Sequence, residues 1–215
     1  MCGIAGFITI DTSHPRDYFK SKILTSLDFL SKRGPDSSGF WIDSDEDIVL
    51  GHTRLEINGL GKEGSQPMTS DSGRYVISFN GEIYNHKILR KEISKNNWNG
   101  SSDTETFLGY LEEFGLNRTL EKVEGMFAIG LWDKNKKELT LIRDRFGEKP
   151  LYFELTKEYL NFASEIEPLT TVFKNKRNVN INAIESLLSY GYVSDKISIY
   201  NEVSKVQPGT YIKFS

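Results

Sequence analysis

The sequence is poor in the residues that cross-link a chain or hold metals. Its one cysteine, Cys2, cannot form an internal disulfide and fits a reducing compartment, so we expect a cytoplasmic protein. Three scattered histidines and that cysteine give no spacing typical of a metal site, and we expect no structural metal. No apolar run is long enough to cross a bilayer, and no basic segment precedes the apolar start of the chain. These absences argue against a membrane span and a secretory signal.

An excess of charge of either sign is also lacking. The 27 Lys and Arg residues and the 30 Asp and Glu residues leave a net charge of -3, with both signs mixed along the chain. The basic stripe that is typical of a nucleic-acid-binding protein is therefore missing. The 215 residues suffice for one large domain with a substantial core.

The apolar, β-prone segments come in blocks joined by short turns rather than singly between helices. This order favours antiparallel sheets covered by helices over a doubly wound parallel sheet. Ser102 and Glu105 have the spacing of a capping box ahead of an apolar stripe. Strands are predicted at residues 3–10, 39–43, 48–52, 74–79, 126–133, 138–143, 150–154, 159–163 and 210–214, and helices at 18–31, 86–95, 102–114 and 182–190.

Cys2 is the residue whose position points most directly to chemistry. Removal of Met1 is generally permitted when a small residue follows, and it gives Cys2 a free α-amino group beside its thiol. That amine titrates near ~8, so about a tenth or more of it is neutral at pH 7 and able to act as a general base. Nucleophile and base then belong to one residue, as in enzymes with an N-terminal threonine. The plainer interpretation is a small, buried cysteine that lies close to the start of the chain.

Five short motifs occur in a fixed order: Met1-Cys2-Gly3-Ile4-Ala5-Gly6, Arg33-Gly34-Pro35-Asp36-Ser37-Ser38-Gly39, Gly51-His52-Thr53-Arg54-Leu55, Phe79-Asn80-Gly81-Glu82-Ile83-Tyr84-Asn85 and Ser102-Asp103-Thr104-Glu105. Segments 66–68, 124–128, 143–152 and 162–165 add to them. Together they resemble the glutaminase half of glutamine-dependent asparagine synthetase. The likeness runs from Met1 to about residue 167 and weakens afterwards, although residues 206–209 still look like the family's segment before its second domain.

The resemblance implies a class II glutamine amidotransferase with the α+β fold of N-terminal-nucleophile hydrolases. That fold is a four-layer αββα sandwich, with two mainly antiparallel sheets between helical layers. Cys2 matches the nucleophile that attacks the side-chain amide of L-glutamine, releases ammonia and leaves a γ-glutamyl thioester for water to hydrolyse. The side chain of Asn80 and the backbone N–H of Gly81 match the oxyanion hole, whose donors are typically worth about 3 kcal/mol of barrier each. Glycine suits its position because substrate can come close to the backbone. No cofactor is implied for this domain.

The resemblance also assigns the residues that bind glutamine. Arg54 matches the residue that holds the α-carboxylate, which a guanidinium grips through two parallel hydrogen bonds. Asp103 matches the acceptor for the α-ammonium group, with Glu82 nearby. Backbone groups of Leu55 and Ile57 complete the slot. Opposite charges at its two ends would select a free amino acid.

Each of these residues also has a purely structural interpretation. Arg54 is explained as a half-exposed strand residue, and Asn80-Gly81 as a common β-turn pair. Asp103 near a helix start is explained by the helix dipole. His52 is expected to be a structural, hydrogen-bonded histidine, because the mechanism needs no imidazole base.

Two further groups are expected to support the site or the fold. Arg33, Gly34 and Asp36 are expected to shape the loop around Cys2. An ion pair and a turn are expected from Arg143, Asp144 and Gly147.

One loop departs from the family pattern. Residues 55–59 read Leu-Glu-Ile-Asn-Gly, where the family usually has a serine after the leucine and a hydrophobic–aspartate pair after the isoleucine. Contacts made through the backbone should survive this change. The stiffness of the loop is the property that the departure puts in doubt.

The family's second domain uses ATP through a pyrophosphate loop, Ser-Gly-Gly-x-Asp-Ser, which this chain does not contain. We divide the chain into a glutamine amidotransferase domain, residues 2–167, and a C-terminal extension, residues 168–215, leading toward a synthetase domain. ATP and Mg are expected only for that missing domain, which would act in cis or in trans. A truncation is favoured, because residues 206–209 stand where the family chain continues. The sequence leaves open which acceptor receives the ammonia and whether the chain forms a homodimer.

Competing functions are distinguished by particular residues. The ammonia would serve asparagine biosynthesis, or a sugar or natural-product amidotransferase. The glutaminase half of a glucosamine-phosphate synthase or an amidophosphoribosyltransferase is disfavoured, because those relatives differ at residues 33–36 and 80–85. A catalytically silent domain that only regulates a partner is disfavoured by the retained site residues, which are Cys2, Arg54, Asn80, Gly81 and Asp103.

Overall fold

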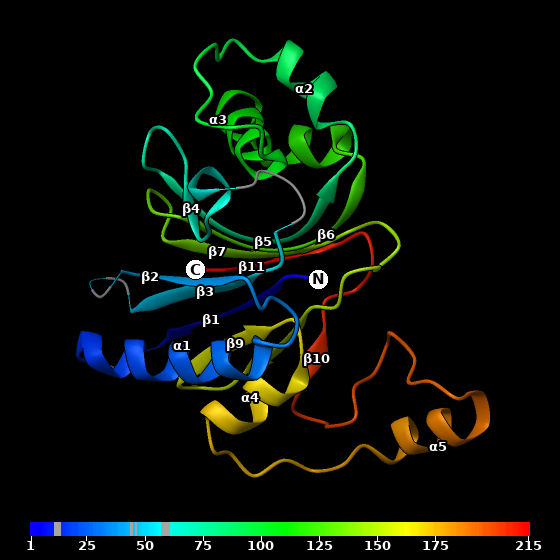
Figure 1. The fold of residues 1–215 in the computed structure, drawn as a ribbon. Helices are drawn as coiled ribbons and strands as arrows, with labels where there is room; N and C mark the ends of the chain where they lie inside the picture. The colour runs from blue at the N-terminus through cyan, green and yellow to red at the C-terminus, as the bar shows by residue number, and fades with distance from the viewer. Residues whose placement is uncertain (11–13, 44, 46, 57–60) are drawn as a thin grey trace.

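The computed structural model of the chain describes residues 1–10, 14–43, 45, 47–56 and 61–215. Two stacked sheets form its centre, and helices cover both outer faces (Figure 1). The helices are α1 (Arg16–Leu30), α2 (His86–Glu92), α3 (Asp103–Lys122), α4 (Ile166–Val172) and α5 (Ile181–Tyr190), with a 3-10 turn η1 (Lys62–Gly64). The strands are β1 (Gly3–Thr9), β2 (Ser37–Asp43), β3 (Ile48–Arg54), β4 (Met68–Thr69), β5 (Tyr75–Ile83), β6 (Gly125–Asp133), β7 (Glu138–Arg143), β8 (Tyr152–Leu155), β9 (Tyr159–Ala163), β10 (Ser204–Lys205) and β11 (Tyr211–Phe214).

The six-stranded sheet has the order β10-β8-β9-β1-β3-β2, and the five-stranded sheet has the order β11-β7-β6-β5-β4. Neighbouring strands run antiparallel in both sheets. α2 and α3 cover the five-stranded sheet, whereas α1 and α4 cover the six-stranded one (Figure 1). The predicted α+β sandwich of four αββα layers is therefore confirmed.

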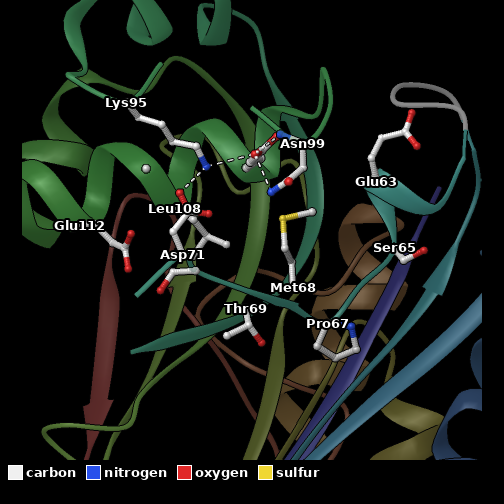
Figure 2. Close-up of a pocket in the computed structure, with 13 residues that line it drawn as sticks. Glu63, Ser65, Pro67, Met68, Thr69, Asp71, Lys95, Asn99, Leu108 and Glu112 are labelled. Carbon is white, nitrogen blue, oxygen red and sulfur yellow. Dashed lines mark hydrogen bonds and ion pairs between the residues drawn. The ribbon is translucent and has the colours of Figure 1, made fainter. Parts of the chain in front are cut away.

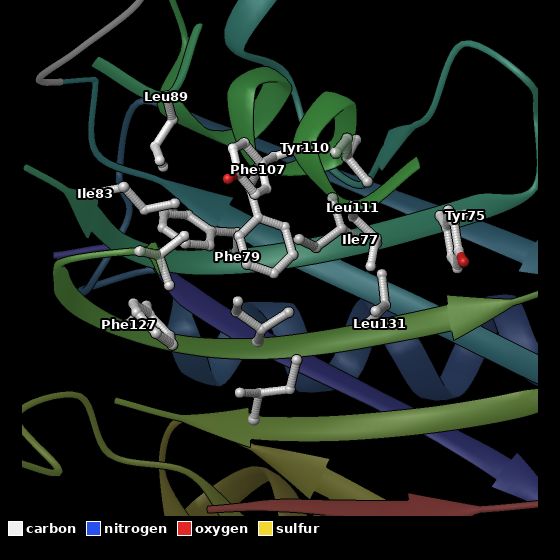
Figure 3. Packing of buried hydrophobic residues seen from close by; sticks show 14 of the residues in the cluster. Tyr75, Ile77, Phe79, Ile83, Leu89, Phe107, Tyr110, Leu111, Phe127 and Leu131 are labelled. Carbon is white, nitrogen blue, oxygen red and sulfur yellow. The ribbon is translucent and has the colours of Figure 1, made fainter. Parts of the chain in front are cut away.

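Three apolar cores separate the four layers. One lies between α2, α3 and the five-stranded sheet, where Phe79 packs near Phe107 and Leu111 (Figure 3). A second lies between the two sheets and includes Trp132 and Phe162. A third lies under α1 and α4. Each fully buried large apolar side chain contributes about 1.5–3 kcal/mol, so these cores fix the relative position of the strands that carry the site.

β1 is central in its sheet, because β3 pairs with one of its edges and β9 with the other. Ile4 lies opposite His52, and Gly3 opposite Thr53. A side chain on Gly3 would have its Cβ 2.7 Å from Thr53 Oγ1, so only glycine fits here. This register fixes Cys2 beside the end of β3.

β5 is longer than the sequence predicts. It continues through Asn80 and Gly81 to Ile83, pairing with β6 along its whole length. The β-turn interpretation of Asn80-Gly81 is therefore wrong. A Cβ on Gly81 would lie 2.2 Å from Met126 O, so the close approach of β6 is a further reason for glycine at this position.

The start of α3 keeps half of the predicted capping box. Ser102 Oγ accepts hydrogen bonds from the N–H groups of Thr104 and Glu105, at 3.1 and 3.4 Å. Glu105 does not complete the box by returning to Ser102. Its carboxylate instead accepts from the N–H groups of Asn99 and Gly100, at 2.8 and 3.1 Å.

The chain after α4 contributes to both sheets. β10 pairs with β8, and β11 pairs with β7. α5 projects from the body of the molecule (Figure 1), and Ala183 is its buried residue. The division of the chain at residue 167 stays a prediction. In the described part of the chain, no helix has the length and apolar character needed to cross a membrane.

Candidate active site

A cavity of about 170 Å³ opens where the end of β3, the C-terminal half of β5 and the start of α3 meet. It gathers seven of the eight predicted site residues. Ile57, the eighth, lies outside the described residues. The cavity is lined by Met1, Cys2, His52, Arg54, Leu55, Gly64, Gln66, Phe79, Asn80, Gly81, Glu82, Ser102, Asp103, Thr104, Met126 and Lys149.

The Cys2 thiol faces the backbone of Leu55. The Leu55 N–H lies 3.5 Å from Sγ and donates to it, and the Leu55 carbonyl oxygen lies 3.7 Å from Sγ. Cys2 is partly exposed, and Met1 ahead of it is 57% exposed. The thiol is therefore held at the cavity wall beside the residue that follows Arg54, rather than packed into hydrocarbon.

The loop after α1 holds the segment around Cys2, as predicted for Arg33, Gly34 and Asp36. Arg33 Nε donates to the Cys2 carbonyl at 3.0 Å, and its Nη1 pairs with Glu165 at 3.0 Å. A Cβ on Gly34 would lie 2.3 Å from the backbone of Thr53, so this loop packs tightly on β3.

Beyond its pairing with β4 at Val76 and Ile77, β5 points a row of backbone N–H groups at the cavity. Alternate residues of an antiparallel strand direct their N–H groups to the same side. The Phe79 N–H donates to Gln66 Oε1 at 2.6 Å, and the Ile83 N–H donates to Asp103 Oδ2 at 2.8 Å. Gly81 lies between them in this alternation, so its N–H points to the same edge, where Gly81 lines the cavity.

The Asn80 side chain leaves β5 on the face opposite to Phe79, toward the six-stranded sheet, and reaches the same cavity. Asn80 is 1% exposed, and within the described residues its Nδ2 has no hydrogen-bond partner. An unpaired buried amide donor costs about 1–3 kcal/mol. Such a donor is stabilised when a ligand oxygen enters the cavity.

Arg54 is buried, with 6% of its side chain exposed. Its Nη1 lies 3.1 Å from Glu56 Oε1 and donates to the Gly61 carbonyl at 2.7 Å. The guanidinium therefore already holds one carboxylate, that of Glu56. The interpretation of Arg54 as a half-exposed strand residue is wrong.

Asp103 is anchored by backbone donors. Its Oδ2 accepts from the Ile83 N–H and its Oδ1 from the Thr104 N–H, at 2.8 and 2.9 Å. Burial raises the pKa of its carboxyl, and these hydrogen bonds and the nearby His86 oppose that rise. A cation that enters the cavity would favour the ionised form. Glu82 lies next to Gly81 in the cavity wall.

His52 is buried between the sheets, and its Nε2 lies 3.1 Å from the Phe79 carbonyl oxygen. A carbonyl accepts a hydrogen bond, so Nε2 carries the proton. Burial lowers the pKa of His52 to about 4, and the Arg54 charge acts in the same direction. The prediction of a structural, hydrogen-bonded histidine is confirmed.

Several cavity residues were given no role by the sequence analysis, among them Gln66, Met126 and Lys149. Gln66 joins β5 to α3, because its Oε1 accepts from Phe79 and its Nε2 donates to Thr104 Oγ1 at 3.3 Å. Met126 and Lys149 line the cavity as well. All three lie in segments that add to the family resemblance, and this was the signal from which the sequence could have identified them.

The loop that carries Lys149 is organised by Asp144. Asp144 accepts from four backbone N–H groups, those of Phe127, Phe146, Glu148 and Lys149. Arg143 pairs with Asp195 at 3.2 Å. The expected ion pair is therefore made with Asp195, and the expected turn is present at Gly147, which has a φ of 67°.

A neighbouring cavity of about 230 Å³ has a different character. Four acidic side chains and Lys95 line it, and Lys95 bridges Asp71 and Glu105 at 2.6 and 3.1 Å (Figure 2). Lys95 pairs with two of the four carboxylates, and Glu105 also binds the loop before α3. In the described ranges, no group of three or more His, Cys, Asp or Glu side chains is placed to hold a metal ion.

Comparison with known proteins places the sequence among glutamine-using enzymes. A family described as a glutamine amidotransferase domain matches residues 1–215. Glutamine-hydrolyzing asparagine synthetase 2 of Bacillus subtilis is 38% identical over 169 residues, which cover 79% of this chain and 22% of that protein. Amidase chry2 of Gibberella zeae is 31% identical over 225 residues, which cover 99% of this chain and 32% of that protein. The chain thus spans about a quarter to a third of the length of these relatives.

Solved structures share the fold. Glutamine phosphoribosylpyrophosphate amidotransferase of B. subtilis, solved with ADP and GMP, matches with a TM-score of 0.69 at 18% identity, over 99% of this chain and 47% of that chain. A structure of the allosteric regulatory enzyme of purine biosynthesis matches with a TM-score of 0.71 at 18% identity, over 99% and 46%. At this identity, the likeness concerns the fold alone.

Proposed function

The chain belongs to the glutamine amidotransferase domain family, and from this premise we propose that it hydrolyses glutamine to glutamate and ammonia with Cys2 as the nucleophile. The observation that carries the proposal is the composition of one cavity. A thiol, a guanidinium, a carboxylate and two N–H donors line it, although they come from positions as far apart as Cys2 and Asp103. Each is a group that the hydrolysis of a free amino-acid amide requires.

The first half of the reaction releases ammonia. With Met1 removed, the α-amine of Cys2 takes the thiol proton as Sγ attacks the side-chain carbonyl carbon of glutamine. The carbonyl oxygen becomes an oxyanion, which Asn80 Nδ2 and the Gly81 N–H stabilise. As the oxyanion collapses, the carbon–nitrogen bond breaks, and the protonated α-amine gives its proton to the leaving nitrogen. Ammonia leaves, and a γ-glutamyl thioester remains on Cys2.

The second half regenerates the thiol. The neutral α-amine removes a proton from water, and the resulting hydroxide attacks the thioester carbon. A second oxyanion forms in the same donor pair. The carbon–sulfur bond breaks, the sulfur recovers its proton from the amine, and glutamate leaves.

The remaining polar groups would orient glutamine. Arg54 would hold its α-carboxylate, and Asp103 and Glu82 would hold its α-ammonium group, with the backbones of Leu55 and Ile57 completing the slot. The neutral His52 does not take part, because no proton transfer in this scheme requires it. The row of N–H groups on the edge of β5 that faces the cavity supports the placement of the substrate amide between Cys2 and Gly81.

The ammonia would be passed to a synthetase domain that activates its acceptor with ATP and Mg. The identity of 38% to a glutamine-hydrolyzing asparagine synthetase favours an amino-acid carboxylate as acceptor. The chain itself would supply the nitrogen only.

The test is ammonia release from glutamine by the chain that begins at Cys2, with its mass confirming the loss of Met1. Cys2→Ala should abolish ammonia release, because it removes the sulfur and keeps the amine. The same chain with Met1 retained should be inactive, because an acylated amine cannot act as the base.

Two controls accompany this test. Cys2→Ala should keep the unfolding midpoint of the native chain, so that loss of activity reports chemistry. It should also still bind glutamine in a calorimeter. Equal rates of ammonia release from the native and Cys2→Ala chains would contradict the proposal.

A further inference from the structure

The carboxylate that Arg54 holds is supplied by the chain itself. Arg54 Nη1 lies 3.1 Å from Glu56 Oε1, in a pair whose side chains are 6% and 31% exposed. Partial burial strengthens such a pair, because water screens it less. Glu56 also stands at the position where the resembling family usually has a serine, which cannot form this ion pair.

Backbone contacts hold Glu56 at this place. Its N–H donates to Asp36 Oδ2 at 2.8 Å. The Asp36 N–H in turn donates to the Arg54 carbonyl at 3.0 Å. Asp36 therefore links the backbones of Arg54 and Glu56 on either side of Leu55. These contacts fix the backbone of Glu56 close to the side chain of Arg54.

We propose that Glu56 is an internal competitor for Arg54, which the α-carboxylate of the incoming substrate must displace. This inference rests on the proposed function, because it takes Arg54 as the group that binds that carboxylate. One guanidinium has five donors and can hold a carboxylate through two of them. Nη1 already donates to Glu56 and to the Gly61 carbonyl. A substrate carboxylate can therefore make the end-on contact through Nη1 and Nη2 only after the Glu56 carboxylate has moved away.

The consequence is a specificity-determining role in glutamine binding. A ligand that carries an α-carboxylate replaces one ion pair of Arg54 with another. A ligand without that group leaves the Arg54–Glu56 pair intact. Removing the Glu56 charge therefore strengthens the binding of ligands that carry an α-carboxylate. The binding of ligands without that group stays the same.

The experiment compares the native chain, Glu56→Gln and Glu56→Ser, each beginning at Cys2. Glu121→Gln is the matched control, because it removes one exposed negative charge on α3, away from the cavity. Ammonia release is measured over a range of glutamine concentrations. Both Glu56 variants should lower KM for glutamine about threefold to tenfold, with kcat at the native value, whereas Glu121→Gln should keep the native KM.

A second substrate separates competition from a general effect on the site. 4-Aminobutanamide has the amide and the ammonium group of glutamine but no carboxylate. Its KM should be the same for the native chain and Glu56→Gln. A similar fall in KM for both substrates would overturn the inference, because the effect would then not act through the carboxylate contact.

Binding without turnover distinguishes the two proposals. Calorimetry with Cys2→Ala and Cys2→Ala/Glu56→Gln should show the same threefold to tenfold gain in glutamine affinity. If the native chain releases no ammonia but this gain appears, the proposed function fails and the inference about Glu56 stands. If the native chain is active and the Glu56 variants bind glutamine no more tightly, the inference fails alone.

Discussion

His52 illustrates how one side chain can line the cavity of the candidate site and still serve the fold. It is buried between the two sheets, where its Nε2–H donates to the Phe79 carbonyl at 3.1 Å. Burial lowers its pKa from 6.5 to about 4, the nearby Arg54 charge adds to this, and the hydrogen bond opposes it. The folded chain therefore keeps His52 neutral at pH values where an unfolded chain would protonate it.

This difference makes stability depend on pH. Between pH 6.5 and about 4 the unfolded state binds a proton at His52 and the folded state does not, so stability falls as pH falls. Each pH unit of that window is worth about 1.4 kcal/mol, giving about 3 kcal/mol in total. His52→Gln, which keeps an amide donor but cannot titrate, should lack this component. Urea unfolding of both chains from pH 7 to pH 4 measures it, and parallel pH curves would contradict the low pKa.

The site residues were predictable to different degrees. Cys2 could be singled out from its position alone. Arg54, Asn80 and Asp103 could be named only through the family motifs, because each has an ordinary structural explanation. Their partners lie far away in the sequence or in a loop, as with the Ile83 N–H on Asp103 and the Glu56 carboxylate on Arg54. A sequence pattern does not contain such contacts.

At the scale of elements, the start of α3 depends on the carboxylate of Glu105. The capping-box pattern assigns this carboxylate to the backbone N–H of Ser102, but in the structure it binds other groups. Glu105 is almost fully buried, with 7% of its side chain exposed, and pairs with Lys95 at 3.1 Å. It accepts the N–H groups of Asn99 and Gly100, and so holds the loop that leads into Asp103. Ser102 Oγ accepts from the N–H groups of Thr104 and Glu105, and Asp103 Oδ1 also accepts from Thr104.

The different roles of Ser102 and Glu105 predict different losses in the free energy of unfolding when each residue is substituted. Ser102→Ala removes a helix cap and should lower the free energy of unfolding by about 1 kcal/mol. Glu105→Gln removes a buried charge that accepts several hydrogen bonds and should cost about 2–3 kcal/mol. Chemical denaturation followed by tryptophan fluorescence measures both. Equal costs would mean that Glu105 acts only as part of a conventional capping box.

Most helices and strands were predictable from the sequence, including short ones such as β11, whereas β4, β10 and α4 were not. β4 and β10 have two residues each, too few for any periodicity. α4 has seven residues and contains Pro168, and its N-cap residue, Glu165, makes no side-chain cap, so it lacks the usual start signal. β5 extends past Asn80-Gly81 because its pairing with β6 outweighs the turn preference of that pair.

At the scale of the whole molecule, a buried ion pair ties the chain after α4 to the six-stranded sheet. Arg177 donates to Glu154 through Nε and Nη2, at 3.1 and 2.7 Å, and the two side chains are 5% and 1% exposed. Arg177 also donates to the carbonyls of Leu169 and Phe173. One side chain thus joins the end of α4 to β8.

Breaking this pair from one side should be costly. Arg177→Met leaves the Glu154 charge buried without its partner and should lower the free energy of unfolding by about 3–5 kcal/mol. Lys213→Met breaks the more exposed pair with Glu138, at 2.8 Å, and should cost less than about 1 kcal/mol. Urea unfolding compares them. Adding Glu154→Gln to Arg177→Met should recover part of the loss, and similar costs for the two single variants would contradict the argument.

The layer order of the molecule was predictable from the blocks of strands and the helices between them, together with the family resemblance. The strand order was not, because the neighbours of β1 come from β3 and β9, far apart in the sequence. The cavity depends on that order, since it forms only when β3, β5 and the start of α3 meet. Geometry at this scale arises from long-range pairing.

The central place of β1 has a consequence for synthesis on the ribosome. β3 can pair with it early, but β9 emerges on the order of 100 residues later, which takes roughly 5–20 s at ordinary translation rates. Until then one edge of the first strand has no partner. The six-stranded sheet can therefore be completed only after most of the chain has been made, although the strand that follows Cys2 is made first.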